Sequence, residues 1–371
     1  MLLRSFWKTA ATLLFFSPAG TALAAEMPHY DHIFVIIAEN KGFKQIMEHP
    51  EWTPQIHKLA AEYGQATQFY AEVHSSEANY IAMLGGDTFG IHDDDAFFCK
   101  AGAKNEFCSK TDAPNYADHS ITARSLMDQM DEKGLTWKGY MEDIPGPGSL
   151  MPRWPTKTYP VTNQPNSLYA AKHNGFVNFK AVYSEPYPDL MKHFVGFSQL
   201  DADIAADTLP NYAHIVPNQC NEMHGMSKGE GNNVPDDCDE KGNLAGLIKR
   251  GDAEMGMLVA KLMQSKAWTG AGNTAIVVTF DENNKEERND GAQGCCGYDP
   301  KSAANFGGGH IVTLIITNHG PRHLVDPTPY NHYSFLRTTE AAFGIDEYLG
   351  HAADKNKGVV TMTPLFVTSS R

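Results

Sequence analysis

Two runs of β-branched and aromatic residues, each followed at once by acidic or amide side chains, constrain the fold of this chain more than any other feature. They are residues 32–38, followed by Glu39-Asn40, and residues 274–280, followed by Asp281-Glu282. Such runs, without polar alternation, are typical of strands that are buried on both faces, as in parallel sheets. The polar pairs therefore stand where two buried strands end.

Helices are expected to alternate with these strands and their neighbours. Further strands are predicted at residues 69–73, 136–141, 213–216 and 311–317, and helices at residues 54–63, 79–84, 125–133, 244–264 and 333–343. This alternation predicts a three-layer α/β fold, in which a doubly wound, mostly parallel sheet carries helices on both faces. Ligands of such sheets bind at the carboxyl ends of the strands, so the polar residues there should converge on one rim.

The first 25 residues are predicted to be a cleavable secretory signal. Arg4 and Lys8 flank an apolar run at residues 13–16, and residues 22–25 supply the small side chains of a cleavage site. We therefore expect a secreted or periplasmic protein. The apolar run is shorter than the roughly 20 residues of a membrane span, so no stable membrane insertion is expected.

Residues 26–371 are expected to form a single domain with a cap-like insertion at about residues 87–165, which is rich in Asp, Gly and Pro. The formal net charge of the full chain is −14, and loss of the signal would remove two positive charges and leave −16. An acidic chain repels the phosphates of nucleic acids and anionic lipids, so neither is expected as a bulk partner. A small phosphorylated substrate can still bind where a cation neutralises the local carboxylates.

Six cysteines in an exported chain suggest disulfides. We expect pairing between neighbours in the sequence: Cys99 with Cys108, Cys220 with Cys238, and Cys295 with the adjacent Cys296. The alternative is a metal site made of thiolates. It is disfavoured because the chain has no C-x-x-C pair and because oxygen ligands dominate its polar clusters.

The two polar pairs at the strand ends predict a metal site. Glu39, Asp281 and Glu282 would repel one another if they met without a cation, at a cost of several kcal/mol. A divalent ion held by these carboxylates and by Asn40 removes that cost. Calcium, magnesium and manganese suit such oxygen ligands best, and zinc is the fourth candidate. The alternative is that both pairs are solvated loop ends.

Ser76 is the candidate nucleophile. It stands between a predicted strand and a predicted helix, where the positive end of the helix favours a phosphate group. A hydroxyl bound to a metal ion loses its proton near neutral pH and needs no histidine base. Asn79 is placed to direct its amide at a non-bridging phosphate oxygen. The alternative for this Ser-x-x-Asn sequence is a helix cap, in which Ser76 accepts from the backbone N–H of Asn79.

His224 and His310 are candidates for cationic or acid groups beside the phosphate. His310 follows three glycines, which allow close approach of the backbone. Other histidines are interpreted as satisfied core or surface residues: His74, His214, His319 and His332. Among these, His74 has the strongest claim to a functional role, because it lies two residues before Ser76 and on the same face of the strand.

These segments together resemble a known family. The matching residues are 32–40, 74–80, 208–212, 216–224, 251–253, 279–282, 309–310 and 330–334. In this order they resemble the secreted bacterial phosphoesterases that include acid phosphatases and phosphocholine-type phospholipases C, within the alkaline phosphatase superfamily. The resemblance implies an alkaline phosphatase-like fold. It also implies a metal ion on Glu39, Asn40, Asp281 and Glu282, with Ser76 as the nucleophile.

The resemblance further places Asn79, His224 and His310 around the phosphate. Relatives bind one metal ion or two, so His224, His310 and Asn218 are alternative ligands of a second ion. The chain departs from the family pattern at Ser75, Glu77 and Ala78, where proline, an apolar residue and proline are common. Glu77 is expected to add negative charge beside the nucleophile and to affect substrate preference.

The function expected is hydrolysis of phosphomonoesters by a secreted, metal-dependent phosphatase through a phosphoserine intermediate. The first alternative is a phosphodiesterase or phospholipase C that uses the same site and has a deeper pocket made by the insertion. The second is a non-catalytic protein that binds a phosphorylated ligand on the same scaffold. The presence of Ser76 and of all the acidic ligands disfavours the second alternative.

Overall fold

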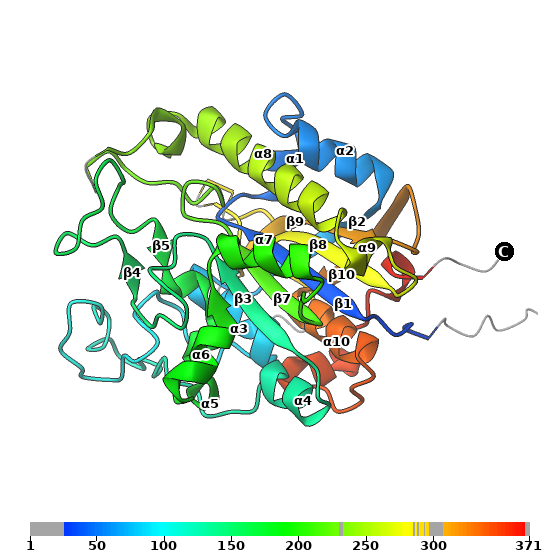
Figure 1. Cartoon of the computed structure of the whole chain (residues 1–371), viewed down its shortest axis with the longest axis horizontal. Helices are drawn as coiled ribbons and strands as arrows, with labels where there is room; N and C mark the ends of the chain where they lie inside the picture. The colour runs from blue at the N-terminus through cyan, green and yellow to red at the C-terminus, as the bar shows by residue number, and fades with distance from the viewer. Residues whose placement is uncertain are drawn as a thin grey trace, which may run out of the picture.

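An eight-stranded sheet forms the centre of the molecule (Figure 1). Its strands, from one edge to the other, are β10 (Leu324–Asn331), β2 (Gly64–Ala71), β9 (Gly309–Thr317), β8 (Thr274–Phe280), β1 (His32–Ala38), β7 (Tyr212–Val216), β3 (Trp137–Met141) and β6 (Phe194–Val195). Strand β9 runs antiparallel to both of its neighbours, and the other pairs are parallel. Two short strands, β4 (Arg153–Trp154) and β5 (Tyr169–Ala170), form a separate antiparallel pair.

This computed structural model describes residues 26–229, 233–284, 286–287, 289–292, 294–296 and 307–367. The predicted signal at residues 1–25 lies outside the described residues. Within them, no helix has the length and apolar character needed to cross a membrane.

Helices cover both faces of the sheet (Figure 1). They are α1 (Phe43–Met47), α2 (Pro54–Glu62), α3 (Ser76–Gly85), α4 (Leu126–Glu132), α5 (Lys180–Tyr183), α6 (Tyr187–His193), α7 (Phe197–Ala206), α8 (Leu244–Leu262), α9 (Lys266–Thr269) and α10 (His332–Ala342). Short 3₁₀ helices are η1 (Ala171–His173), η2 (Gly175–Asn178), η3 (Asp236–Cys238), η4 (Gly350–Ala353), η5 (Lys355–Lys357) and η6 (Thr363–Leu365). Helices α2 and α8 pack together on one face, and α3 packs on α10 on the other.

The two central strands, β1 and β8, set the position of the rim. They are paired in parallel from His32 opposite Thr274 to Ala38 opposite Phe280, so both end at the same level. The backbone N–H of Asp281 extends the ladder by donating to the carbonyl of Ala38 at 3.0 Å. Every residue of β8 is buried, and burial of one large aliphatic side chain stabilises the fold by roughly 1.5–3 kcal/mol. This core therefore holds the two polar pairs side by side.

The predicted fold class is confirmed, and the main differences lie at the edge of the sheet. Strand β10 was not predicted, because Pro327 and Pro329 disfavour a strand in the sequence. It lies at the sheet edge, where one side of the strand needs no donors and proline is tolerated. Strand β2 starts five residues earlier than predicted, at Gly64. Strand β3, within the segment at residues 87–165, belongs to the central sheet.

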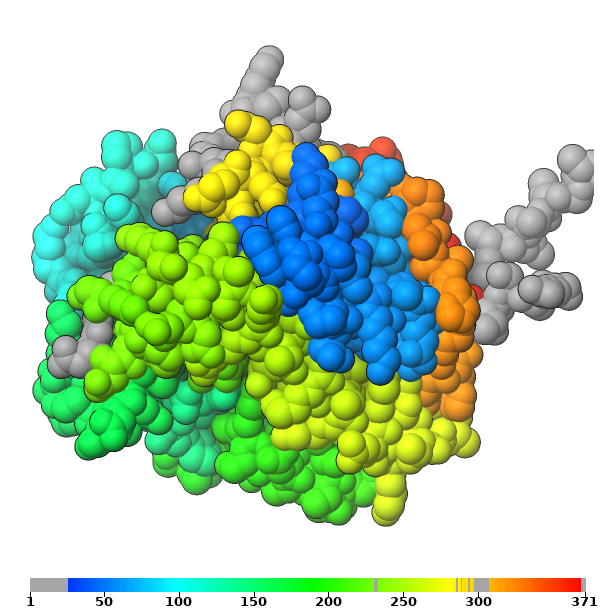
Figure 2. Space-filling model, turned by 90° about the horizontal axis from the view of Figure 1, so that it is seen from above, coloured from blue at the N-terminus to red at the C-terminus, as the bar shows by residue number. Residues whose placement is uncertain are grey.

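Asp252 of α8 ties two helices together on the face seen in Figure 2, where α2 and α8 lie side by side. Its carboxylate accepts from the backbone N–H groups of Gln55 and Ile56 at 2.9 Å each, in the first turn of α2. We expect Asp252→Ala to lower the free energy of unfolding by about 1–3 kcal/mol, because two backbone donors, one of them buried, lose their acceptor. Urea unfolding measures this loss. The exposed Glu62→Ala, also on α2, is the control and should change stability by less than about 0.5 kcal/mol.

Candidate active site

The predicted nucleophile and acidic residues meet at the rim. Ser76 is the first residue of α3, and its Oγ donates to Glu39 Oε2 at 3.0 Å and lies 3.3 Å from Glu282 Oε1. The backbone N–H of Asn40 donates to Asp281 Oδ1 at 2.9 Å. Ser76 is only 1% exposed and the three carboxylates are buried. Side chains more than 200 residues apart in the sequence thus form one cluster.

Glu39 is held in place by its neighbours. The Tyr80 hydroxyl donates to Glu39 Oε1 at 2.8 Å, and the Asn40 amide donates to Glu39 Oε2 at 2.8 Å. Asn40 has a φ of 55°, a left-handed conformation that asparagine tolerates better than most residues. Its turn directs the backbone N–H toward Asp281. Each carboxylate oxygen of Glu39 therefore has a defined direction, one toward Ser76 and one toward Tyr80.

A cation would stabilise the ionised forms of the buried carboxylates in this cluster. Burial, and next the neighbouring carboxylate of Asp281, raises the pKa of Glu39 and of Glu282 well above the ordinary value. Burial also raises the pKa of Asp281. The Oδ2 atom of Asp281 is buried without a hydrogen-bond partner among the described residues. This set of oxygen atoms therefore fits a divalent metal ion, which would favour the ionised carboxylates and satisfy the orphaned oxygen.

The surroundings of Ser76 differ from those of a helix cap. Ser75 occupies the cap position of α3 and its side chain makes no cap bond, while Ser76 turns toward the carboxylates. The helix-cap alternative for Ser76 is therefore wrong. Asn79 holds the turn from inside: its Oδ1 accepts from the backbone N–H groups of Glu72 at 3.0 Å and Val73 at 3.2 Å. Its predicted contact with phosphate remains a prediction.

His74 belongs to the cluster, although it was interpreted as a satisfied residue outside the site. Its Nδ1 forms an ion pair with Glu282 Oε2. By contrast, His214 is a satisfied core residue, buried and hydrogen-bonded to the Tyr212 hydroxyl at 2.7 Å. The position of His74 relative to Ser76 was the available signal, since alternate residues of an extended chain point to the same face.

His224 lies at the rim, but its charge differs from the expected one. Its Nδ1 contacts the carbonyl of Gly225 at 2.8 Å, and its Nε2 lies 3.2 Å from Lys172 Nζ. Burial first, and the ammonium of Lys172 next, lowers the pKa of His224 to about 3. His224 is therefore neutral at neutral pH, and the positive charge beside it is that of Lys172.

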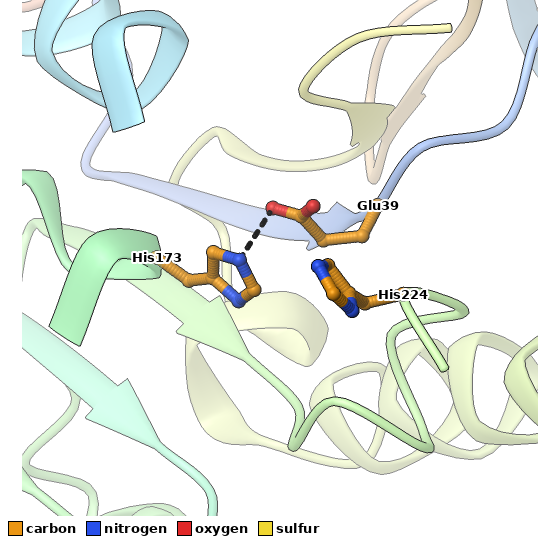
Figure 3. Close-up of side chains that lie close together, drawn as sticks. All are labelled: Glu39, His173 and His224. Atoms are coloured by element: carbon orange, nitrogen blue, oxygen red, sulfur yellow. Dashed lines mark ion pairs between the residues drawn. The ribbon is translucent and has the colours of Figure 1, made fainter. Parts of the chain in front are cut away.

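His173 is a site residue that the sequence did not reveal. Figure 3 shows it facing Glu39 and His224, and one ligand atom from each of the three lies within 4.8 Å of the others. Its Nε2 lies 3.3 Å from Glu39 Oε1, and its Nδ1 lies 2.7 Å from Glu222 Oε1. Burial lowers the pKa of His173 and raises that of Glu222.

His310 and Asn218 make their polar contacts elsewhere. His310 Nε2 lies 2.9 Å from the carbonyl of Thr67, and its ring stacks on Phe43 with a centroid distance of 4.2 Å. The amide of Asn218 donates to Asp143 at 2.7 Å. No contact between either side chain and the Ser76 cluster is found among the described residues. Their roles toward phosphate or a second ion remain predictions.

Glu77 does not add charge beside the nucleophile, and that expectation is wrong. Its buried carboxylate lies 3.0 Å from His119 Nδ1 and accepts from the Asn178 amide. His119 also pairs with Asp93 at 3.1 Å. Burial opposes a charge on His119, but Glu77 and Asp93 outweigh it and raise the pKa of His119 to about 10. The helix turns Glu77 away from Ser76 and into a buried ionic network.

The three expected disulfides are present. They join Cys99 to Cys108, Cys220 to Cys238, and Cys295 to Cys296. The described part of the chain has no free cysteine, so the alternative of a thiolate metal site is wrong. The first bridge lies in the loop that follows α3, and the second in the loop that carries His224.

Comparison with known proteins identifies the family of the chain. The family model described as the phosphoesterase family matches residues 48–346. The chain belongs to the phosphoesterase family. It is 27% identical to the phosphatidylinositol-3-phosphatase of Mycobacterium tuberculosis, over 87% of this chain and 80% of that protein. It is also 25% identical to the phosphate-repressible acid phosphatase of Penicillium chrysogenum, over 90% of this chain and 63% of that protein. The family match and these relatives therefore indicate an enzyme that hydrolyses phosphate esters.

The fold comparison agrees with the predicted fold class. A solved protein of the alkaline phosphatase superfamily from Vibrio parahaemolyticus matches with a TM-score of 0.52 and 13% identity, over 96% of this chain and 76% of that one. This likeness shows the fold alone. The chain spans 63% of the Penicillium acid phosphatase and 59% of an acid phosphatase from Aspergillus fumigatus, to which it is 23% identical.

Proposed function

We propose that this protein is an exported, metal-dependent phosphomonoesterase in which Ser76 attacks phosphorus. The observation that carries the proposal is the position of Ser76 Oγ, 3.0 Å from Glu39 and 3.3 Å from Glu282 in a buried carboxylate cluster. Relatives named acid phosphatase and phosphatidylinositol-3-phosphatase support monoester substrates. Three disulfides support export, since such bonds persist in oxidising compartments.

Glu39, Asn40, Asp281 and Glu282 would hold the divalent ion, together with Ser76. When bound, the ion supplies positive charge that favours the serine alkoxide and polarises the phosphoryl group. The hydrogen bonds from Tyr80 and Asn40 keep Glu39 aligned. The role of the protein is thus to present one hydroxyl, that of Ser76, in one orientation beside these carboxylates.

The proposed reaction has two displacements at phosphorus. In the first, a bond forms between Ser76 Oγ and phosphorus while the bond from phosphorus to the ester oxygen breaks, and the alcohol leaves with the proton lost by Ser76. In the second, water attacks the phosphoserine, which returns the hydroxyl of Ser76 and releases inorganic phosphate. Neither step changes an oxidation state, so no redox partner is needed.

The experiment that tests this function compares p-nitrophenyl phosphate with bis-p-nitrophenyl phosphate as substrates of the purified protein. We expect kcat/KM for the monoester to exceed that for the diester by at least about tenfold, and a chelator to abolish both activities. Calcium, magnesium, manganese and zinc, each added back to chelated protein, identify the ion. A preference for the diester would replace the proposal with a phosphodiesterase, and absence of turnover with every ion would favour a binding protein.

A further inference from the structure

Lys172 is a partly buried cation at the rim that the proposed reaction does not yet use. It lies on η1, next to His173, and its side chain is 19% exposed. Its Nζ contacts two side chains: Asp94 Oδ2 at 3.1 Å and His224 Nε2 at 3.2 Å. Because His173 and His224 both face Glu39, Lys172 borders the carboxylate cluster that holds Ser76.

Asp94 connects Lys172 to the nucleophile. The same carboxylate that pairs with Lys172 accepts, at 3.3 Å, from the backbone N–H of Glu77, the residue after Ser76. The hydroxyl of Ser75, the residue before Ser76, donates to the carbonyl of His92 at 3.3 Å. The loop that carries Asp94 therefore packs along the turn that presents Ser76, and it fixes the distance between the ammonium and the hydroxyl.

The charge of Lys172 is secured by its surroundings. Burial would lower its pKa, but the carboxylates of Asp94 and Glu39 outweigh burial and raise the pKa above the ordinary value. Lys41 is a fully buried lysine near the rim, and its pKa shifts in the opposite direction. Its Nζ donates to the backbone carbonyls of Met223 at 2.7 Å and Asn40 at 3.2 Å, and burial lowers its pKa. Lys41 therefore donates to backbone carbonyls, whereas Lys172 contacts the carboxylate of Asp94 and the imidazole of His224 at the site.

We propose that Lys172 is a substrate-binding residue whose ammonium group contacts the non-bridging oxygens of the phosphoryl group attacked by Ser76. The proposal rests on the proposed function and names a further residue of the same site. In phosphoryl transfer, charge is spread over three equatorial oxygens, and a lysine acts on them as a point charge. The ammonium now shared between Asp94 and the neutral His224 can offer its third proton to such an oxygen.

This contact also gives a role to the aspartate run at residues 93–95. Asp93 pairs with His119, and Asp95 accepts from the backbone N–H groups of Ser109 and Lys110 at 2.7 and 2.8 Å. Between them, Asp94 is the one member of the run whose partner is a site residue. The outer two aspartates fix the loop, and the middle one positions Lys172.

The test compares Lys172→Met with Lys172→Arg, and with Lys138→Met as a matched control. Lys138 also pairs with an aspartate, Asp203, and has a similar exposure of 21%, but it lies on β3 and its partner on α7. Three quantities are measured for each variant: kcat and KM for p-nitrophenyl phosphate, the inhibition constant of inorganic phosphate, and the metal content per chain.

We expect Lys172→Met to raise the inhibition constant of phosphate and to lower kcat/KM, each by roughly 10–100-fold, the loss for one hydrogen bond from a charged group. Metal content should stay as in the wild type. Lys172→Arg should retain phosphate binding within about fivefold, and Lys138→Met should match the wild type. An inhibition constant within twofold of the wild-type value in Lys172→Met, or an equal loss in Lys138→Met, overturns the proposal.

Two further measurements test the contact with Lys172 even if the protein does not hydrolyse monoesters or if Lys172→Met does not fold. Calorimetric titration of phosphate into the metal-loaded protein reports binding without turnover, so a protein that proves not to hydrolyse monoesters still tests the contact with Lys172. If Lys172→Met fails to fold, Asp94→Asn removes the charge that positions Lys172 while the ammonium is kept. It should raise KM more than it lowers kcat, and an unchanged KM would also overturn the proposal.

Discussion

Replacing Ser76 with alanine is expected to lower kcat for phosphate monoesters by at least about 1,000-fold, which corresponds to about 4 kcal/mol of transition-state stabilisation. The reason is geometric. Ser76 Oγ is the only described hydroxyl that contacts both Glu39 and Glu282, at 3.0 and 3.3 Å. Without it, water must attack phosphorus directly, with no residue placed to orient it. Steady-state turnover of p-nitrophenyl phosphate measures the effect.

Ser75→Ala is the matched control, because its hydroxyl is one residue away and donates to the carbonyl of His92 instead of the cluster. It should reduce kcat by less than about tenfold, the loss for one neutral hydrogen bond. Incubation with substrate followed by acid quench should leave phosphate on Ser76 of the wild type and none on the Ser76→Ala chain. A Ser76→Ala protein that retains a tenth of wild-type kcat would show that Ser76 is not the nucleophile.

The central strands could be predicted from the sequence because burial on both faces leaves a continuous apolar run. Residues 274–280 match β8 at both ends, and residues 32–38 match β1. Strand β10 could not be predicted, since an edge strand tolerates prolines that would exclude a central one. The start of α3 at Ser76 was placed three residues late, because Ser76, Glu77 and Ala78 give no apolar periodicity.

The candidate site was partly predictable for a related reason. Residues that directly follow buried strands, such as Glu39 and Asp281, are located by the topology rule for parallel sheets. Lys172 and His173 follow only the two-residue strand β5 and lie on a 3₁₀ helix, so no periodic pattern marks them. The direction of the Glu77 side chain could not be predicted from the sequence either. Sequence adjacency places it beside Ser76, but successive helical residues are about 100° apart and point to different neighbours.

Removal of the metal ion is expected to abolish activity and to make the stability of the folded protein fall as pH rises. In the folded, metal-free cluster, burial and mutual repulsion raise the pKa values of Glu39, Asp281 and Glu282 above their ordinary values. The folded state therefore binds more protons than the unfolded chain between the ordinary carboxyl range of about pH 4 and the raised pKa values. Unfolding then releases protons, and stability declines with increasing pH up to the raised pKa values.

A bound divalent ion reverses this dependence, because it favours the ionised carboxylates that the empty cluster disfavours. The difference in unfolding temperature between metal-loaded and chelated protein should therefore widen from about pH 5 to about pH 8. Other buried acids, such as Glu72 and Glu340, whose pKa values are raised to about 8 by burial, affect both forms equally and cancel in the difference. Asp281→Asn is the control. It removes one of the repelling charges and one ligand, so its unfolding temperature should depend little on the metal at any pH. A difference that stays constant with pH in the wild type would mean that the ion does not bind at these carboxylates.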